Sequence, residues 1–205
     1  MASKEIKQLI QQFAKLPTIN SRQAKKIIAY LLENLSNNGI DSGNFILLLE
    51  RIRTNICKCE KCGNVLISQD YCEICYKSEK NFSNIICVVE NLYELWRISA
   101  LSNLDSYKFH ILGGVISATN GISPDMLSIL SLVQRIENEE ASEVIIALNK
   151  SYNGSITVNY VANILKKKHP NLRISTFAGG LPSGTDLDFI DDRTLEMAMN
   201  SRILC

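Results

Sequence analysis

The sequence predicts an α+β protein of several parts, and three observations support this fold class. Apolar residues recur at helical spacing near the N-terminus, four cysteines form two CxxC pairs, and short apolar runs then alternate with helical stretches. We therefore expect a helix-hairpin-helix-like region, a four-cysteine zinc knuckle, an α/β domain with a four-stranded parallel sheet, and a C-terminal loop with a short helix. These four segments span residues 1–56, 57–76, 82–178 and 179–205.

Composition is that of an ordinary globular protein. Hydrophobic residues make up 46% of the chain and charged residues 21%, and no apolar run reaches the roughly 18 residues that a membrane span needs. Residues 1–62 hold ten Lys/Arg against five Asp/Glu, whereas residues 63–205 hold twelve against sixteen. The basic front part suggests a polyanion such as nucleic acid as partner; a solvated helical surface is the alternative.

Three helices are expected in the first segment, because its apolar residues follow the helical repeat. Pro17 ends the first helix, since the residue before a proline avoids the helical conformation, and Ser21 is the expected N-cap of the second. The three apolar stripes comprise Ile6, Leu9, Ile10 and Phe13; Ala24, Ile27, Ile28, Leu31 and Leu35; and Phe45, Leu48, Leu49 and Ile52.

The connector between the first two helices resembles a helix-hairpin-helix, in which backbone N–H groups at the start of the second helix hold DNA phosphates. Arg22, Lys25 and Lys26 are the cations that would contact DNA there. Such hairpins usually carry glycines, and here Thr18 and Asn20 stand instead. Two interpretations therefore stay open, a DNA-binding hairpin and an ordinary corner between two helices.

The cysteines carry the strongest motif. Two pairs, Cys59-x2-Cys62 and Cys72-x2-Cys75, can bring four sulfurs into a tetrahedron around zinc. A disulfide framework is the alternative, but disulfides are rare in reducing compartments and the first residues do not resemble a secretory signal. Cys57 could compete as a ligand, whereas Cys87 lies in an apolar run and is expected in the core.

The rear of the chain alternates strands and helices, which predicts a parallel sheet covered by helices on both faces. Ser123-Pro124 is expected to start one of the helices and another spans 157–168. The predicted strands are 85–89, 109–112, 144–148 and 173–177.

Glu90 is the candidate for chemistry, because it follows the first strand at the sheet edge where ligands approach. It could act as a base or help to hold Mg²⁺, or it could simply begin a helix. The loop after the third strand, 149–155, has no carboxylate. An acidic run near the C-terminus could reach the same edge or form a solvated loop; it comprises Asp186, Asp188, Asp191 and Asp192. His110 and His169 receive no catalytic role.

Taken together, these motifs resemble the RecR family of bacterial recombination mediators over nearly the whole chain, and the resemblance implies a Toprim domain from about 82 to 178. The matching stretches are Leu16-Pro17, the two CxxC pairs, Ile86-Cys87-Val88-Val89-Glu90, Asn120-Gly121-Ile122-Ser123-Pro124-Asp125, Val144-Ile145-Ile146-Ala147 followed by Asn149, and Gly180-Leu181-Pro182 with Gly184.

Three stretches depart from the family pattern. The family's Pro-Gly-Val-Gly is replaced by 17–20 (Pro-Thr-Ile-Asn), its Glu-Gly-Glu by 153–155 (Asn-Gly-Ser), and its Ser-Pro-Leu-Asp by 117–120 (Ser-Ala-Thr-Asn). The second change removes most acidic ligands of a Toprim metal site, so Mg²⁺ binding near Glu90 is doubtful on this comparison.

The resemblance implies a non-enzymatic DNA repair factor of the bacterial cytoplasm, associated with the nucleoid and not with a membrane. Such proteins bind single- and double-stranded DNA, assemble as homo-oligomeric rings, commonly tetramers, and act with RecO and RecF to load RecA on single strands. Zinc would be structural. Two other functions remain open at this point, a metal-dependent Toprim enzyme acting on nucleic acid and a zinc-ribbon scaffold that binds only proteins.

Overall fold

The computed structural model describes residues 3–34, 42–68, 71–80, 84–101, 107–177, 191, 192 and 194. The chain divides into two compact units, 1–56 and 57–205. Most of the predicted C-terminal loop and helix lies outside the described residues. None of the described helices is long and apolar enough to cross a membrane.

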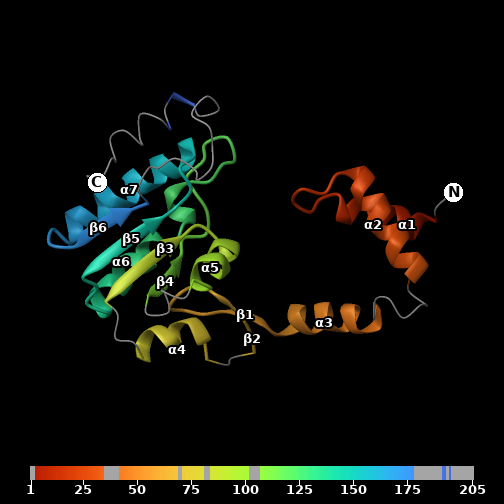
Figure 1. Cartoon of the computed structure of the whole chain (residues 1–205), viewed down its shortest axis with the longest axis horizontal. Helices are drawn as coiled ribbons and strands as arrows, with labels where there is room; N and C mark the ends of the chain where they lie inside the picture. The colour runs from red at the N-terminus through yellow and green to blue at the C-terminus, as the bar shows by residue number, and fades with distance from the viewer. Residues whose placement is uncertain are drawn as a thin grey trace, which may run out of the picture. The chain divides into compact units, whose positions relative to one another are not determined.

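The first unit contains α1 (Lys4–Phe13), α2 (Ser21–Asn34) and α3 (Ser42–Asn55), as the apolar stripes predict (Figure 1). α1 packs against α2, and Ala24 and Ile28 of α2 are buried. By contrast, α3 exposes five consecutive apolar side chains, 45–49, each between 45% and 64% exposed. The third apolar stripe is therefore largely exposed in this chain.

The second unit is built on a four-stranded sheet with the order β4-β3-β5-β6 and only parallel pairings. The fold class predicted from sequence is thus confirmed, and the strand boundaries agree within one residue. The strands are β3 (Ile85–Val89), β4 (Lys108–Ile111), β5 (Glu143–Ala147) and β6 (Arg173–Thr176).

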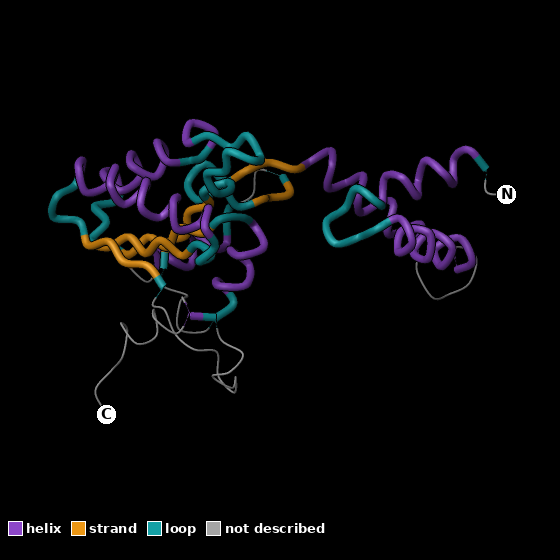
Figure 2. Tube along the Cα trace, turned by 90° about the horizontal axis from the view of Figure 1, so that it is seen from above, coloured by secondary structure: helices purple, strands orange, loops and turns teal. Residues whose placement is uncertain are grey.

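Helices cover both faces of this sheet (Figures 1 and 2). On one face, α6 (Ile129–Asn138) and α7 (Tyr152–Lys168) pack on side chains of β3 and β5. On the other face, α5 (Leu92–Ser99) packs its buried Leu95 against Cys87 and Phe109. Alternate residues of β3 enter the two cores, which explains why this strand is apolar throughout.

The predicted helix start at Ser123-Pro124 is correct only in part. Residues Pro124–Met126 form a single 3-10 turn (η1), after which Leu127 is extended with ψ 151°. The N–H of Ser128 donates to the carbonyl of Leu112 at 2.9 Å, and α6 begins only at Ile129. This bond to the strand-end loop draws the chain out of helical geometry between the two elements.

The cysteine-rich segment forms a ribbon of β1 (Ile56–Lys58) and β2 (Val65–Ile67), followed by α4 (Glu73–Lys80). It attaches to β4, an edge strand of the sheet. The N–H of Ile111 donates to the carbonyl of Cys62 at 2.8 Å, and α4 packs against β4. The cysteine segment and the sheet therefore belong to one folded unit.

Candidate metal centre and nucleic-acid interface

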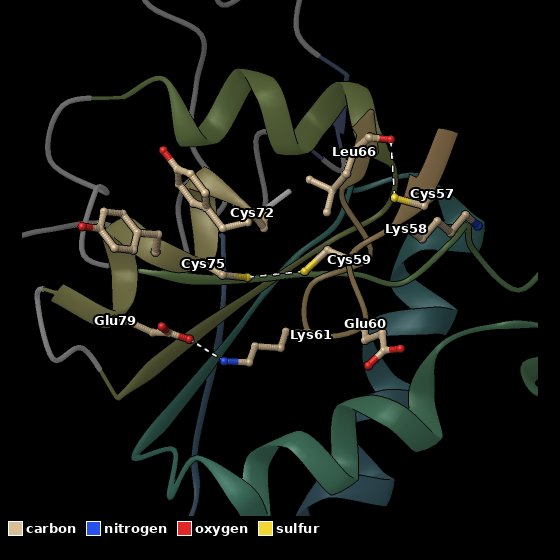
Figure 3. A pocket seen from close by; sticks show the side chains of 11 residues that line it. Cys57, Lys58, Cys59, Glu60, Lys61, Leu66, Cys72, Cys75 and Glu79 are labelled. Atoms are coloured by element: carbon tan, nitrogen blue, oxygen red, sulfur yellow. Dashed lines mark hydrogen bonds and ion pairs between the residues drawn. The ribbon is translucent and has the colours of Figure 1, made fainter. Parts of the chain in front are cut away.

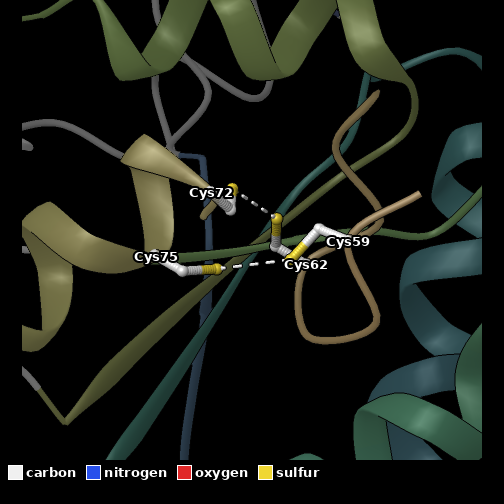
Figure 4. A group of neighbouring side chains, drawn as sticks. All are labelled: Cys59, Cys62, Cys72 and Cys75. Atoms are coloured by element: carbon white, nitrogen blue, oxygen red, sulfur yellow. Dashed lines mark hydrogen bonds between the residues drawn. The ribbon is translucent and has the colours of Figure 1, made fainter. Parts of the chain in front are cut away.

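The side chains of four cysteines converge where the β1–β2 ribbon meets α4 (Figure 4). The Sγ atoms of Cys59 and Cys75 lie 3.8 Å apart, those of Cys62 and Cys72 lie 3.6 Å apart, and all four lie within 4.8 Å of one another. A tetrahedral zinc ion with bonds of about 2.3 Å has sulfur ligands about 3.8 Å apart. The cluster can therefore hold a metal ion such as zinc.

The first pair of cysteines lies in a tight turn closed by backbone hydrogen bonds. The N–H of Gly63 donates to the carbonyl of Cys59, and the N–H of Cys59 donates to the carbonyl of Asn64, both at 2.8 Å. Gly63 has φ +79°, and a Cβ there would lie 3.2 Å from the Cβ of Ile111. Glycine is therefore required both by the turn and by its packing on β4.

Asn64 also supplies the cluster with N–H donors. Its backbone N–H lies 3.4 Å from the sulfur of Cys62, and its side-chain amide lies 3.7 Å from the sulfur of Cys72. Hydrogen bonds from Cys62 and Cys75 lower the pKa of the Cys72 thiol, whereas contacts with Cys62 and Cys72 raise the pKa of Cys75. A bound metal ion would displace the remaining thiol protons, so metal binding and proton release are linked.

The remaining described cysteines do not join this cluster. The thiol of Cys57 faces away along the ribbon and donates to the carbonyl oxygen of Ser68 at 3.2 Å. Cys87 is buried beneath α5, and burial raises the pKa of its thiol to about 12. Cys57 therefore does not replace Cys59 in this arrangement, and Cys87 is a core residue as expected.

Glu90 lies at the carboxyl end of β3, where sequence placed it, but it has a carboxylate neighbour that sequence reasoning missed. One carboxylate oxygen of Glu94 accepts a hydrogen bond from the backbone N–H of Glu90 at 3.1 Å. Burial and the charge of Glu94 raise the pKa of Glu90. Glu90 precedes Asn91, the N-cap of α5, and Glu94 reaches back to it from the first turn of that helix.

The side-chain amide of Asn149 bridges these two carboxylates. The side-chain Nδ2 of Asn149 donates to Glu94 at 2.8 Å and to Glu90 at 3.4 Å. Mg²⁺ requires oxygen ligands in near-octahedral geometry, and here the third group offers N–H donors to the two carboxylates. The Glu90 cluster (Glu90, Glu94 and Asn149) thus consists of two carboxylates joined by one amide donor.

The loop that carries Asn149 is held against α7 at very short range. A Cβ on Gly154 would lie 1.9 Å from the carbonyl oxygen of Asn149, so only glycine fits. Next to it, the side-chain amide of Asn153 donates to the hydroxyl of Ser117 at 3.2 Å. Asn153 and Ser117 both lie in stretches that differ from the family pattern, and here a neutral hydrogen bond joins the first turn of α7 to the loop that carries Ser117.

The corner between α1 and α2 differs from the expectation in two respects. Asn20, and not Ser21, is the N-cap: its Oδ1 accepts from the N–H groups of Arg22 at 3.0 Å and Gln23 at 2.9 Å. The side chain of Gln23 in turn accepts from the N–H of Asn20 at 2.8 Å, which completes a capping box. Thr18 has the left-handed conformation, with φ 64°. The amides that would bind phosphate in a helix-hairpin-helix are thus already occupied.

The three predicted DNA-contacting cations, Arg22, Lys25 and Lys26, are exposed on α2. Their spacing of three and four residues places them on neighbouring positions of the helix surface. Within the part of the chain that the structure describes, no carboxylate forms an ion pair with them. Their charges are therefore available to phosphates.

Two of the four residues of the C-terminal acidic run, Asp186 and Asp188, lie outside the described residues. Asp191 and Asp192 are exposed, and the carboxylate of Asp191 accepts from the N–H and the hydroxyl of Thr194 at 3.0 and 2.7 Å. His110 is buried with its Nε2 2.9 Å from the carbonyl of Ser128, and burial lowers its pKa to about 4. The histidine contact joins β4 to Ser128, the residue before α6.

Comparison with known proteins gives matches to two families. Residues 84–178 match the Toprim domain, and residues 180–203 match the RecR C-terminal region. The chain is 35% identical over 98% of its length to recombination protein RecR of Erythrobacter litoralis, covering 98% of that protein. It is 34% identical over 97% of both chains to RecR of Neorickettsia sennetsu, and 31% identical over 97% of its length to RecR of Cereibacter sphaeroides, covering 96% of that protein.

Proposed function

The chain belongs to the RecR family of recombination proteins, and on this premise we propose that it is a non-enzymatic DNA-binding repair factor. It acts with RecO and RecF to load RecA on single-stranded DNA in the bacterial cytoplasm, at the nucleoid. The similarity along nearly the entire chain is the observation that carries this proposal. It spans the helical region, the cysteine cluster, the Toprim domain and the C-terminal region.

Zinc has a structural role in this proposal, with Cys59, Cys62, Cys72 and Cys75 as its ligands. Four thiolates fill a tetrahedral zinc site, so no coordination position remains for water or substrate. The geometry of the sulfurs supports this assignment. The ion would join the turn that carries Cys59 and Cys62 to the start of α4, and the N–H of Ile111, which donates to the carbonyl of Cys62, holds this turn on β4.

DNA is bound in this proposal through the side chains of Arg22, Lys25 and Lys26 and not through the capped amides of α2. Binding is then independent of sequence and sensitive to salt. Replacing all three residues by Ala should reduce the slope of log K against log salt concentration by about 2.7 per chain bound to duplex DNA, because each lost phosphate contact contributes about 0.9.

The matched control replaces three exposed lysines at the end of α7, 166–168, by Ala, which removes the same charge from another helix. Its salt slope should equal that of the wild type. Equal slopes for the α2 variant and the wild type would contradict the proposed contacts, and absence of any DNA binding by the wild type, also with RecO present, would contradict the function.

The exposed apolar side chains 45–49 of α3 support assembly into a homo-oligomer, and we propose a tetrameric ring. Monomeric proteins rarely expose contiguous apolar surface of this kind. Light scattering of the full chain with and without DNA measures the assembly. A particle wide enough to surround a duplex separates a ring from a protein that binds only along the side of DNA.

A protein-interaction scaffold is the second candidate, and the capping box at Asn20 favours it, since the phosphate-binding amides are occupied. Recovery of a RecO-type partner by a chain that binds no DNA would support the scaffold. A Toprim enzyme is disfavoured by the amide that closes the Glu90 cluster. Cleavage of labelled DNA with Mg²⁺ or Mn²⁺, abolished by Glu90→Gln, would reverse this ranking.

A further inference from the structure

A groove of about 590 Å³ opens at the cysteine cluster, and Cys59, Cys72 and Cys75 form part of its lining (Figure 3). It lies between the turn that carries Cys59 and the side of α4, and the labelled side chains of Lys58, Lys61 and Glu79 stand around it. Its volume lies in the range of about 300–1,000 Å³ typical of sites for small ligands. It is therefore large enough to admit a planar ring.

Two tyrosines line this groove and expose much of their ring surface. Tyr71 is 69% exposed and Tyr76 is 46% exposed. The two rings meet edge to face with centroids 5.3 Å apart, and the ammonium group of Lys80 lies 4.6 Å from the centroid of Tyr76. The tyrosines thus form a small aromatic cluster in which a cation lies over the ring of Tyr76, whereas the ring of Tyr71 is the more exposed of the two.

A base is a better occupant of this groove than a phosphate. Four thiolates around one zinc ion carry a formal charge of about −2, which repels anions close to the sulfurs. A neutral base can lie on tyrosine beside them, while lysines at the margin attract the phosphates of the same strand. These lysines are Lys58, which lines the groove, and Lys80, which lies over the ring of Tyr76; Lys61 is paired with Glu79.

We propose that Tyr71 and Tyr76 form a base-stacking subsite for single-stranded nucleic acid. The inference rests on the proposed DNA-binding function and adds a second contact region, in the cysteine segment, to the cations of α2. Stacking on aromatic side chains tolerates any base sequence, and it favours single strands because the bases of a duplex already stack on one another. We therefore expect the two tyrosines to make the chain bind single-stranded nucleic acid more tightly than duplex.

The experiment compares two single-stranded oligonucleotides of about 20 nucleotides, longer than typical single-strand site sizes of about 4–16. One carries ordinary bases, and the other is abasic with the same number of phosphates. We expect the full chain to bind the ordinary strand about tenfold more tightly. In Tyr71→Leu/Tyr76→Leu this preference should disappear, while affinity for the abasic strand and zinc content stay unchanged.

Two variants control for loss of packing. Tyr71→Phe/Tyr76→Phe keeps both rings and should keep the preference, and Tyr152→Leu removes an exposed tyrosine of α7 that does not line the groove. A leucine variant that still prefers the ordinary strand, or a wild type that binds both strands equally, overturns the stacking subsite alone. A wild type that binds neither strand overturns the proposed DNA-binding function as well.

Discussion

The cysteine cluster and the Glu90 cluster both gather ligand-type side chains in the second unit, yet they differ in what already satisfies those ligands. The sulfurs contact mainly one another, at 3.6 and 3.8 Å, with two long N–H contacts from Asn64. At the Glu90 cluster, the Asn149 amide donates to both carboxylates. The two clusters therefore differ in how strongly a neutral donor satisfies the ligands: Asn64 lies 3.4 and 3.7 Å from two of the sulfurs, whereas Asn149 lies 2.8 Å from the carboxylate of Glu94.

The largest expected effect comes from breaking the cysteine cluster. In Cys62→Ser, purified protein should lose its zinc and its Tm should fall by roughly 10 °C, because structural zinc contributes directly to folding free energy. Amides of β4 should exchange faster, since the Ile111 N–H bonds to the carbonyl of Cys62. Elemental analysis, calorimetry and hydrogen exchange measure the three effects.

Cys57→Ser is the matched control for this prediction, because Cys57 lies close by in sequence but its thiol contacts carbonyl groups of the ribbon. It should keep its zinc and lose at most a few degrees of Tm. The assignment of the ligands would be refuted by a Cys62→Ser protein with unchanged zinc content, or by a Cys57→Ser protein that loses the metal.

The second prediction has a smaller effect. It concerns a substitution that should convert the Glu90 cluster into a cation-binding site. Asn149→Asp replaces the amide donor by a third carboxylate, so repulsion should lower the Tm by about 2–10 °C in the presence of EDTA. Mn²⁺ should restore the Tm of this variant and leave that of the wild type unchanged. Thermal unfolding with and without Mn²⁺ measures both effects.

The pH dependence gives the Asn149→Asp prediction a sign. Burial and the charge of Glu94 raise the pKa of Glu90 in the folded protein above its value in the unfolded chain. The free energy of unfolding should therefore fall as pH rises from the unfolded pKa to the folded pKa of Glu90. The variant adds to this cost, and its deficit should shrink as pH falls and the carboxylates take up protons. Glu90→Gln/Asn149→Asp, which removes one carboxylate, is the control and should not respond to Mn²⁺. If Mn²⁺ stabilised the wild-type protein at this cluster, the Asn149 amide would not prevent cation binding there.

The cysteine cluster and the Glu90 cluster differ in how well sequence predicts them, because their residues are separated by different distances along the chain. The cysteines lie within 17 consecutive residues, 59–75, so local spacing alone predicts their convergence. Asn149 lies 59 residues after Glu90, and only the parallel pairing of β3 with β5 brings the two together. Sequence therefore predicted the sheet, the position of Glu90 and a neutral loop opposite it that begins at Asn149, but not the second carboxylate, Glu94.

Other differences arose where tertiary contacts or competing caps decided the outcome. Leu127 leaves the predicted helix because Ser128 bonds to the loop after β4. Ser21 and Asn20 are both good N-caps by residue type, and Gln23 decides in favour of Asn20 because it stands three residues later and completes the reciprocal bond. That second signal was readable in the sequence, unlike the first.

The smallest expected effect concerns this corner, the other place where an asparagine occupies groups that could bind a ligand. Asn20→Gly removes the acceptor from the N–H groups of Arg22 and Gln23, and glycine at an N-cap costs only a few tenths of a kcal/mol. Interaction of an anion with a helix N-terminus contributes about 0.3–1 kcal/mol. Affinity for DNA should therefore rise roughly two- to fivefold in a titration at low salt, with almost unchanged Tm.

Asn20→Asp is the control for this change, since it keeps an acceptor for both amides and adds a negative charge; its affinity for DNA should fall. If Asn20→Gly binds DNA no better than the wild type, DNA binding at this corner depends on the side chains of α2 alone. Asn20 then does not prevent ligand binding in the way proposed for Asn149 in the Glu90 cluster. A rise in affinity would instead mean that the cap of α2 excludes phosphate for the same reason that Asn149 excludes a cation: in both places a neutral side chain has already satisfied the charged or polar groups on which a ligand would depend.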